Sequence, residues 1–238
     1  MLSAKEISSG LATEKAHMTP FQTHRGLLVT LDRANVDTDQ IIPKQFLKSI
    51  ARTGFGEQLF HDWRYRPDGT PNPDFELNAP RFKGASVLVT RNNFGCGSSR
   101  EHAVWAIQQA GIRSVIAPWQ QRGSTRVPAF ADIFRTNSAK NALLTVELSE
   151  AEVEEIFQMV GRYERLDATV DLDRQRVTLH LAEEIAFHFE IDPGVKARLI
   201  HGQDEIALTL AHDEALRAFE ARHDPQWPGP TAPSRGGG

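Results

Sequence analysis

The chain has little cysteine, no long hydrophobic run and no excess of basic residues. Its 238 residues include one cysteine, Cys96, which excludes an intramolecular disulfide and any metal or iron–sulfur site that needs several thiolates from this chain. No apolar run approaches the ~20 residues of a membrane helix. The net charge of −4 gives no reason to expect a nucleic-acid or anionic-membrane partner. The first residues lack the basic-then-apolar order of a secretory signal, so we expect a cytoplasmic protein.

The composition is that of an ordinary globular protein, with 40% apolar and 24% charged residues. A chain of this length can form one large domain or two small ones. Residues 1–24 show no sustained periodicity and predict a flexible N-terminal extension. Residues 223–238 are rich in Pro and Gly and predict a disordered tail. Residues 25–222 are therefore expected to form the folded domain.

Strand-like and helix-like segments alternate along this domain. Apolar and β-branched residues predict strands at 26–31, 85–90, 114–117 and 185–191, and a hairpin over 170–172 and 176–179. Helices are predicted to begin at two Ser-x-x-Glu capping boxes, Ser98 to Glu101 and Ser149 to Glu152, and at Asp192–Pro193. Residues 61–80 are rich in Pro and Gly and predict a long irregular loop. This order predicts an α/β sandwich with a mixed β-sheet and flanking helices.

A glycine turn joins a predicted buried strand to a predicted helix start at residues 91–103, Arg-Asn-Asn-Phe-Gly-Cys-Gly-Ser-Ser-Arg-Glu-His-Ala. Such a junction presents free backbone N–H groups beside the positive end of a helix dipole, where an anion is stabilised. The two glycines let a ligand approach the backbone, and Arg100 could bind a carboxylate through two parallel hydrogen bonds. The residues alone predict an anion-binding turn. The alternative is that Ser98 only caps a helix and Arg100 lies in solvent.

Two segments carry a family resemblance. Residues 95–102 resemble the Gly-x-Gly-Ser-Ser-Arg-Glu-His motif of the aconitase swivelling-domain family, and Cys96 is the variant found in bacterial 3-isopropylmalate dehydratase small subunits. Residues 35–43, Asn-Val-Asp-Thr-Asp-Gln-Ile-Ile-Pro, are similar to a second motif of that family. The similarity extends over nearly everything from about Gly26 to Arg222. It implies the α/β fold of an aconitase-type swivelling domain.

The resemblance also implies a reaction. Enzymes of this family act on 2- or 3-hydroxy acids, and the bacterial small subunits that this chain resembles help interconvert 2-isopropylmalate and 3-isopropylmalate in leucine biosynthesis. A proton is removed next to a carboxylate, hydroxide leaves to an iron of a [4Fe–4S] cluster, and water returns in the other orientation. Because Cys96 is the only thiol, the cluster is expected on a separate large subunit, and no cofactor on this chain. The active protein would be a heterodimer or a larger heteromer that binds a hydroxy-dicarboxylic acid.

Site residues follow from the same resemblance, and no metal ligands are among them. The expected catalytic residues are Ser98 and Asp39, and the expected substrate-binding residues are Ser99, Arg100, Thr38 and Gly97. Ser98 would act as an alkoxide base, stabilised by the N–H groups of the turn, the helix start and Arg100. Asp39 matches the family's active-site aspartate. Asp37 and Thr38 are also expected to shape the bend at residues 35–40 through Asx-type hydrogen bonds.

The chain departs from its relatives after Pro118, where about ten extra residues stand at 119–129 and Ala129 replaces a serine. This insertion follows a strand end, where ligand sites of α/β proteins gather, so it could obstruct the substrate or the large subunit, or be harmless. Two alternatives stay open. One is a related hydro-lyase for homoaconitate, methylmalate or citraconate, and the other is a non-catalytic carboxylate-binding module disabled by the insertion. A third hypothesis makes Cys96, with His102, a reactive thiol.

Overall fold

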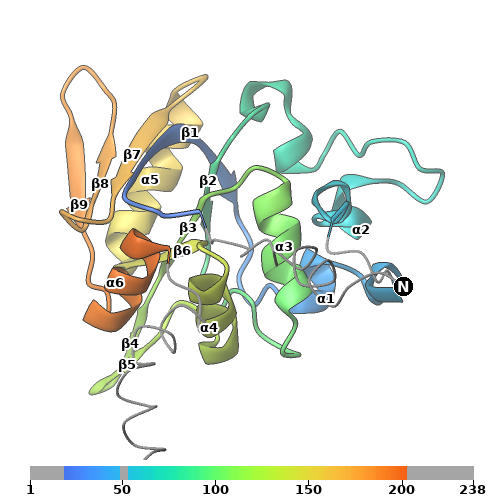
Figure 1. Cartoon of the computed structure of the whole chain (residues 1–238). Coiled ribbons are helices and arrows are strands. Elements are labelled where there is room, and N and C mark those ends of the chain that lie inside the picture. Colours follow the sequence, from blue (N-terminus) through green and yellow to red (C-terminus); the bar gives the residue numbers. More distant parts are fainter. Residues whose placement is uncertain (1–18, 49–52, 203–238) are drawn as a thin grey trace, which may run out of the picture. The chain divides into compact units, whose positions relative to one another are not determined.

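A seven-stranded mixed sheet organises the protein in the computed structural model, which describes residues 19–48 and 53–202 (Figure 1). The strand order is β6-β3-β2-β1-β7-β8-β9. The strands are β1 (Thr23–Leu31), β2 (Val87–Thr90), β3 (Ser114–Pro118), β6 (Leu144–Leu148), β7 (Asp167–Asp171), β8 (Arg176–Leu179) and β9 (Ile185–His188). Strands β6, β3, β2 and β1 are parallel, and β7, β8 and β9 continue from β1 in antiparallel order. The predicted α/β class with a mixed sheet is confirmed.

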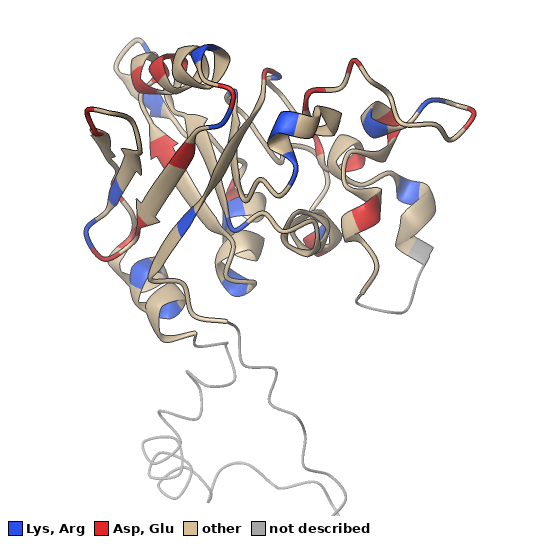
Figure 2. Ribbon diagram, turned by 90° about the horizontal axis from the view of Figure 1, so that it is seen from above, with Lys and Arg blue, Asp and Glu red and all other residues tan. Residues whose placement is uncertain are grey.

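Helices cover both faces of the sheet. They are α1 (Thr38–Ile41), α2 (His61–Arg64), α3 (Glu101–Gln109), α4 (Asp132–Lys140), α5 (Glu150–Arg162) and α6 (Pro193–His201), with 3₁₀ turns η1 (Lys44–Lys48), η2 (Gly56–Gln58), η3 (Glu76–Asn78) and η4 (Pro80–Phe82). Helix α5 packs on β1, β2 and β3, while α3 packs against α1 and α4. Figure 2 shows the sheet between these layers, with basic and acidic residues interspersed along the elements.

The core lies where parallel strands are covered on both faces. All four residues of β2 and all five of β3 are buried, as expected for strands between two helix layers. The edge strand β6 and the inner strand β7 instead alternate buried and partly exposed residues. On α5, Val153, Ile156 and Val160 are buried, and their spacing places them on one face of the helix. In the described residues, no helix combines the length and apolar composition needed to cross a membrane.

Two of the three predicted helix starts are confirmed. Ser149 caps α5 and forms a capping box with Glu152. Asp192 caps α6, which starts at Pro193 and ends before Gly202 in the left-handed conformation. The capping box predicted at Ser98 is wrong, because α3 begins at Glu101 and its N-cap residue is Arg100. The carbonyl of Ser98 accepts a hydrogen bond from the Thr38 hydroxyl, which fixes it against α1 instead of in a helical turn.

Other boundaries shift by a few residues. The N-terminal extension was expected to reach residue 24, but Phe21 is buried and β1 starts at Thr23. The loop predicted at 61–80 contains α2 and η3, and begins η4. Strand β9 ends at His188 instead of reaching residue 191. Residues 1–18 of the predicted extension, and the whole predicted tail at 223–238, lie outside the described residues.

The insertion at 119–129 folds as a β-hairpin. Strand β4 (Gln120–Arg122) pairs with β5 (Thr125–Val127) in antiparallel order, and they form a two-stranded sheet. Gly123 turns the chain with a positive φ of 59°, which a glycine adopts without steric cost. The extra residues are therefore an ordered element with its own backbone hydrogen bonds.

Candidate active site

The two motif segments meet at the carboxyl edge of the parallel strands. Strand β1 leads into the bend before α1, and its neighbour β2 leads into the glycine turn before α3. The segments join through backbone hydrogen bonds: Gly95 N–H donates to the Val36 carbonyl (2.8 Å), and Thr38 N–H donates to the Cys96 carbonyl (3.0 Å). The sheet thereby brings together residues about 60 positions apart in sequence.

The bend itself is built as expected for Asp37. Its carboxylate accepts a hydrogen bond from Gln40 N–H (2.8 Å), and the Gln40 side chain accepts one from Asp37 N–H (2.9 Å). This reciprocal pair is a capping box that starts α1. The structural role predicted for Asp37 is confirmed, and the bend places Thr38 and Asp39 in the first turn of α1.

Both glycines of the turn are required by geometry. Gly95 has a φ of 74° and Gly97 a φ of 89°, a region that residues with a side chain rarely adopt. A Cβ on Gly95 would lie 2.2 Å from the ring of Phe134, and one on Gly97 would lie 3.4 Å from the Cβ of Asp37. The turn therefore packs its backbone directly onto α4 at one glycine and onto the α1 bend at the other.

Ser98 and Ser99 are exposed at the tip of this turn. The buried Thr38 donates its hydroxyl hydrogen to the Ser98 carbonyl (3.0 Å). Because this bond fixes the backbone and leaves the Ser98 side chain outside, the Ser98 hydroxyl is presented to an incoming molecule. The contact of Thr38 is a positioning contact, and its substrate-binding role stays a prediction.

Asp39 and Arg100 form an ion pair across the two segments. The Arg100 side chain is only 16% exposed and that of Asp39 is 39% exposed. The Lys44 ammonium lies 3.2 Å from the other carboxylate oxygen of Asp39. Lys44 was not singled out from the sequence, because no motif includes it. It is the first residue of η1, which follows α1 closely in the chain. A guanidinium carries five N–H donors, so Arg100 keeps donors for a second carboxylate while Asp39 holds it.

The reactive-thiol hypothesis for Cys96 finds no support in this geometry. Burial raises the pKa of the Cys96 thiol, and the neighbouring Asp37 carboxylate raises it further, so the thiol is protonated at neutral pH. The His102 ring packs edge-on against Phe55, with ring centroids 5.3 Å apart, and lies 4.8 Å from Trp105. His102 is thus part of an aromatic cluster and is not shown as a base for Cys96.

This chain does not fit an iron–sulfur cluster. The sequence holds a single cysteine, whereas such clusters are bound by several thiolates. Across residues 19–48 and 53–202, no group of three or more His, Cys, Asp and Glu side chains is placed to hold a metal ion. The residues gathered at the turn are suited instead to a carboxylate ligand.

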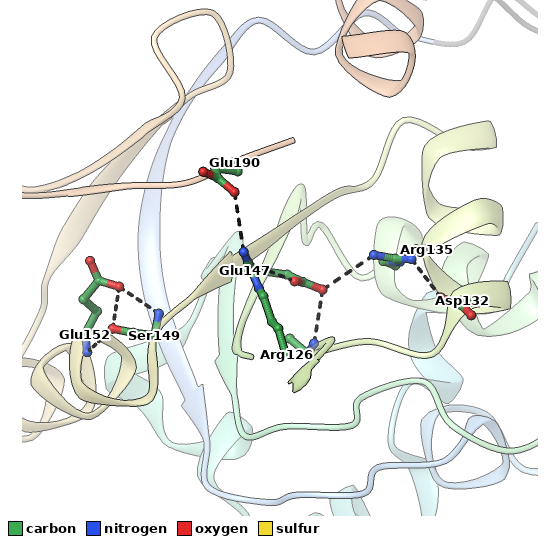
Figure 3. Close-up of polar contacts among 8 residues, drawn as sticks. Arg126, Asp132, Arg135, Glu147, Ser149, Glu152 and Glu190 are labelled. Atoms are coloured by element: carbon green, nitrogen blue, oxygen red, sulfur yellow. Dashed lines mark hydrogen bonds and ion pairs between the residues drawn. The ribbon is translucent and has the colours of Figure 1, made fainter. Parts of the chain in front are cut away.

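The insertion hairpin is attached beside the turn. The Asn92 amide donates to the Gln120 side-chain carbonyl (3.2 Å), and the Gln120 amide donates to Glu150 (2.9 Å). Its second strand contributes Arg126, which pairs with Glu147 and Glu190 at 3.5 Å each (Figure 3). These contacts direct the hairpin towards β6 and the end of β9, while Asp39 lies on α1.

Comparison with known proteins gives the family. Residues 18–151 match the family of aconitase C-terminal domains, and residues 205–228 match the C-terminal domain of 3-isopropylmalate dehydratase small subunits. The chain is 58% identical over 210 residues to the 3-isopropylmalate dehydratase small subunit of Desulforapulum autotrophicum, which covers 88% of this chain and 98% of that protein. The chain belongs to the family of 3-isopropylmalate dehydratase small subunits.

A second relative in this family is the 3-isopropylmalate dehydratase small subunit of Rhodopirellula baltica, 53% identical over 204 residues, with 85% of this chain and 98% of that protein covered. Among solved structures, the 3-isopropylmalate dehydratase of Methanocaldococcus jannaschii matches with a TM-score of 0.53 and 23% identity, covering 83% of this chain and 99% of that one. That structure supports the aconitase-type fold. The family resemblance stated from residues 35–43 and 95–102 is confirmed.

Proposed function

We propose that this chain works as the small subunit of a 3-isopropylmalate dehydratase, a hydro-lyase that interconverts 2-isopropylmalate and 3-isopropylmalate in leucine biosynthesis. Family membership supports the reaction. The observation that carries the site assignment is the Asp39–Arg100 ion pair beside the exposed Ser98. It joins the two family motifs in one place and combines a carboxylate-binding cation with a hydroxyl group. The cytoplasmic location expected from the sequence stays a prediction.

Substrate binding is assigned to the cationic side of the turn. Arg100 would bind one carboxylate of the substrate through parallel N–H donors, and Ser99 would donate its hydroxyl hydrogen to the same group. Asp39 keeps the guanidinium oriented, with Lys44 as its second partner. Gly97, which has no side chain, would let the substrate approach the backbone.

Proton transfer is assigned to Ser98. Its Oγ would take the proton from the carbon next to a substrate carboxylate. An alkoxide is a strong base that needs positive surroundings, which Arg100 and the start of α3 would supply. Thr38 would keep the Ser98 backbone in place through its bond to the carbonyl. A base positioned in this way contributes roughly 10²–10⁴-fold to the rate.

A large subunit is proposed to complete the site. Ser98 and Ser99 are exposed, and an alkoxide in open water would be neutralised, so an active enzyme needs a second surface to cover the turn. The [4Fe–4S] cluster is assigned to that partner, because this chain has a single cysteine. The stoichiometry of the complex can be one pair or more.

Two alternative functions make different demands on the same site. A hydro-lyase for homoaconitate, methylmalate or citraconate would need the same turn, and the names of both close relatives favour isopropylmalate. A non-catalytic binding module would need an insertion that blocks the turn. The contacts of the hairpin run towards Glu147 and Glu190, which favours an active subunit.

The test is isomerisation by a mixture of this chain and a cluster-loaded bacterial large subunit, with each protein alone as control. The substrates are 2-isopropylmalate, homoaconitate and citraconate. Turnover of 2-isopropylmalate in the mixture only is the expected result. A preference for another acid would point to the related hydro-lyase, and complex formation with substrate binding but no turnover would contradict a catalytic role.

A further inference from the structure

A largely buried carboxylate lies outside the site described above. Glu147, on the edge strand β6, has a side chain that is only 14% exposed. Its Oε1 accepts a hydrogen bond from the Ala129 N–H (3.1 Å), and its Oε2 lies 3.5 Å from the guanidinium of Arg126 (Figure 3). Arg135 of α4 lies 3.9 Å from Oε1. Burying a charge is unfavourable unless it is paired, and these three partners compensate the cost.

Ala129 connects this carboxylate to the glycine turn. Its N–H donates to Glu147, and its carbonyl accepts a hydrogen bond from the Phe94 N–H (3.0 Å). The Phe94 carbonyl in turn accepts from the Ala131 N–H (3.2 Å). Phe94 is the residue immediately before Gly95. Two successive hydrogen bonds therefore join the Glu147 carboxylate to the start of the turn that carries Ser98.

The same segment forms the floor under the turn. The ring of Phe134 occupies the space where a Cβ of Gly95 would stand. It packs edge-on against Phe94, with centroids 5.3 Å apart, and stacks on Phe130 at 6.1 Å. Residues 129–134, which include the first turn of α4, therefore set the position and orientation of the glycine turn. Glu147 binds the start of this segment through Ala129 and contacts α4 through Arg135.

We propose that Glu147 is a positioning residue of the active site, which fixes residues 129–134 under the glycine turn and thereby places Ser98. Glu147 also holds the insertion in place, because it contacts Arg126 in β5 and Ala129, the last residue of the insertion. The role in positioning Ser98 rests on the proposed function, whereas the effect on the turn does not.

Cys96 provides a probe of the turn that needs no partner and no substrate. It is the only thiol of the chain and lies between the two glycines. The thiol is partly exposed, so its rate of alkylation by iodoacetamide, measured in the isolated full chain well below the melting temperature, reports how well the turn shields it. Because a hydrogen bond to a charged group is lost, Glu147→Ala should raise this rate on the order of tenfold. Glu147→Gln keeps an acceptor oxygen for Ala129 and should raise it less.

Glu152→Ala is the matched control. Glu152 accepts from the Ser149 N–H (2.7 Å) and completes the capping box of α5, so its loss should lower the melting temperature while leaving the alkylation rate of Cys96 unchanged. An equal rise for Glu152→Ala and Glu147→Ala, or no rise for Glu147→Ala, would overturn the proposal. If Glu147→Ala does not fold, the single variants Glu147→Gln and Arg126→Ala are measured instead. An unchanged alkylation rate of Cys96 in both of them would also overturn the proposal.

The complex provides the second readout. Arg100 is held by Asp39, from the α1 side, so substrate affinity should survive better than proton transfer. With a large subunit and 2-isopropylmalate, Glu147→Ala should lower kcat about tenfold and change KM much less, and Glu147→Gln should recover part of kcat. Unchanged kcat would contradict the role in placing Ser98. An inactive wild-type mixture would count against the proposed function alone, since the alkylation rates are measured independently.

Discussion

The parallel half and the antiparallel half of the sheet differ in where the segments that follow their strands emerge. In the parallel half, β1 and β2 point the same way, so the bend before α1 and the glycine turn before α3 emerge side by side. In the antiparallel half, β7 and β8 are joined by a short connection, and successive strands end at opposite edges. Every candidate site residue follows a parallel strand. Parallel order gathers chemistry at one edge, because all carboxyl ends meet there.

The largest effect is expected on kcat when the Ser98 hydroxyl, which lies after a strand of the parallel half, is removed. Ser98→Ala should lower kcat of the complex with the large subunit about 10²–10⁴-fold, because a positioned base is lost, with no change in melting temperature. The readout is isomerisation of 2-isopropylmalate. Ser124→Ala, in the exposed turn of the hairpin, is the matched control and should keep full activity. Near-normal turnover by Ser98→Ala would remove Ser98 from the mechanism.

Gly95→Ala should break the packing under the same turn. Its positive φ costs on the order of 1–2 kcal/mol for an alanine, and the clash with Phe134 adds about 1–3 kcal/mol. Urea unfolding measures the loss. Gly161→Ala is the control, since a Cβ there meets no atom within 4 Å in the last turn of α5, and it should stabilise the chain by less than about 1 kcal/mol. Equal shifts in the two variants would refute the close packing described for Gly95.

Two buried valines, one in each half of the sheet, test whether the halves act separately on the glycine turn. Val89 in β2 and Val170 in β7 are both fully buried, and truncation of either to Ala should cost about 2 kcal/mol of the free energy of unfolding. Only Val89→Ala should also raise the alkylation rate of Cys96, since β2 leads into the glycine turn. An equal rise in the alkylation rate of Cys96 for Val170→Ala would contradict this difference between the two halves.

The smallest expected effect is a pH dependence of the free energy of unfolding, caused by His24 in the part of β1 that pairs with β7. Burial lowers the pKa of His24, and the Arg113 guanidinium lowers it further, while the ring accepts or donates a hydrogen bond with Ser86 at 2.7 Å. Because the unfolded chain keeps a pKa of about 6.5, it binds the proton more readily, so stability should fall as pH drops below roughly 6.5. His24→Gln should weaken this dependence. Urea midpoints between pH 8 and pH 5 test it, and parallel curves for both proteins would contradict it.

Local patterns predicted most elements of this fold. The β-branched runs located β2 and β3, and the Ser149 and Asp192 caps located α5 and α6, because these signals act within a few residues. The same reasoning was wrong at Ser98, where an identical Ser-x-x-Glu spacing does not start a helix. There, the Ser98 backbone carbonyl accepts a hydrogen bond from the Thr38 hydroxyl, which lies 60 residues away, and a local pattern does not contain that contact.

Residue patterns along the chain predicted the α/β class, and two contiguous motifs predicted the family; both are confirmed. The same motifs predicted the six residues of the candidate site, whose roles stay predictions. Tertiary structure alone decided that Asp39 pairs with Arg100 and Lys44, that the insertion is a hairpin held by Glu147, and that Phe134 lies under Gly95. Except for Asp39 with Lys44, which are close in sequence, these contacts join residues from distant strands and helices. Their energies depend on distance in space, which follows from strand order and packing and leaves no mark in the local sequence.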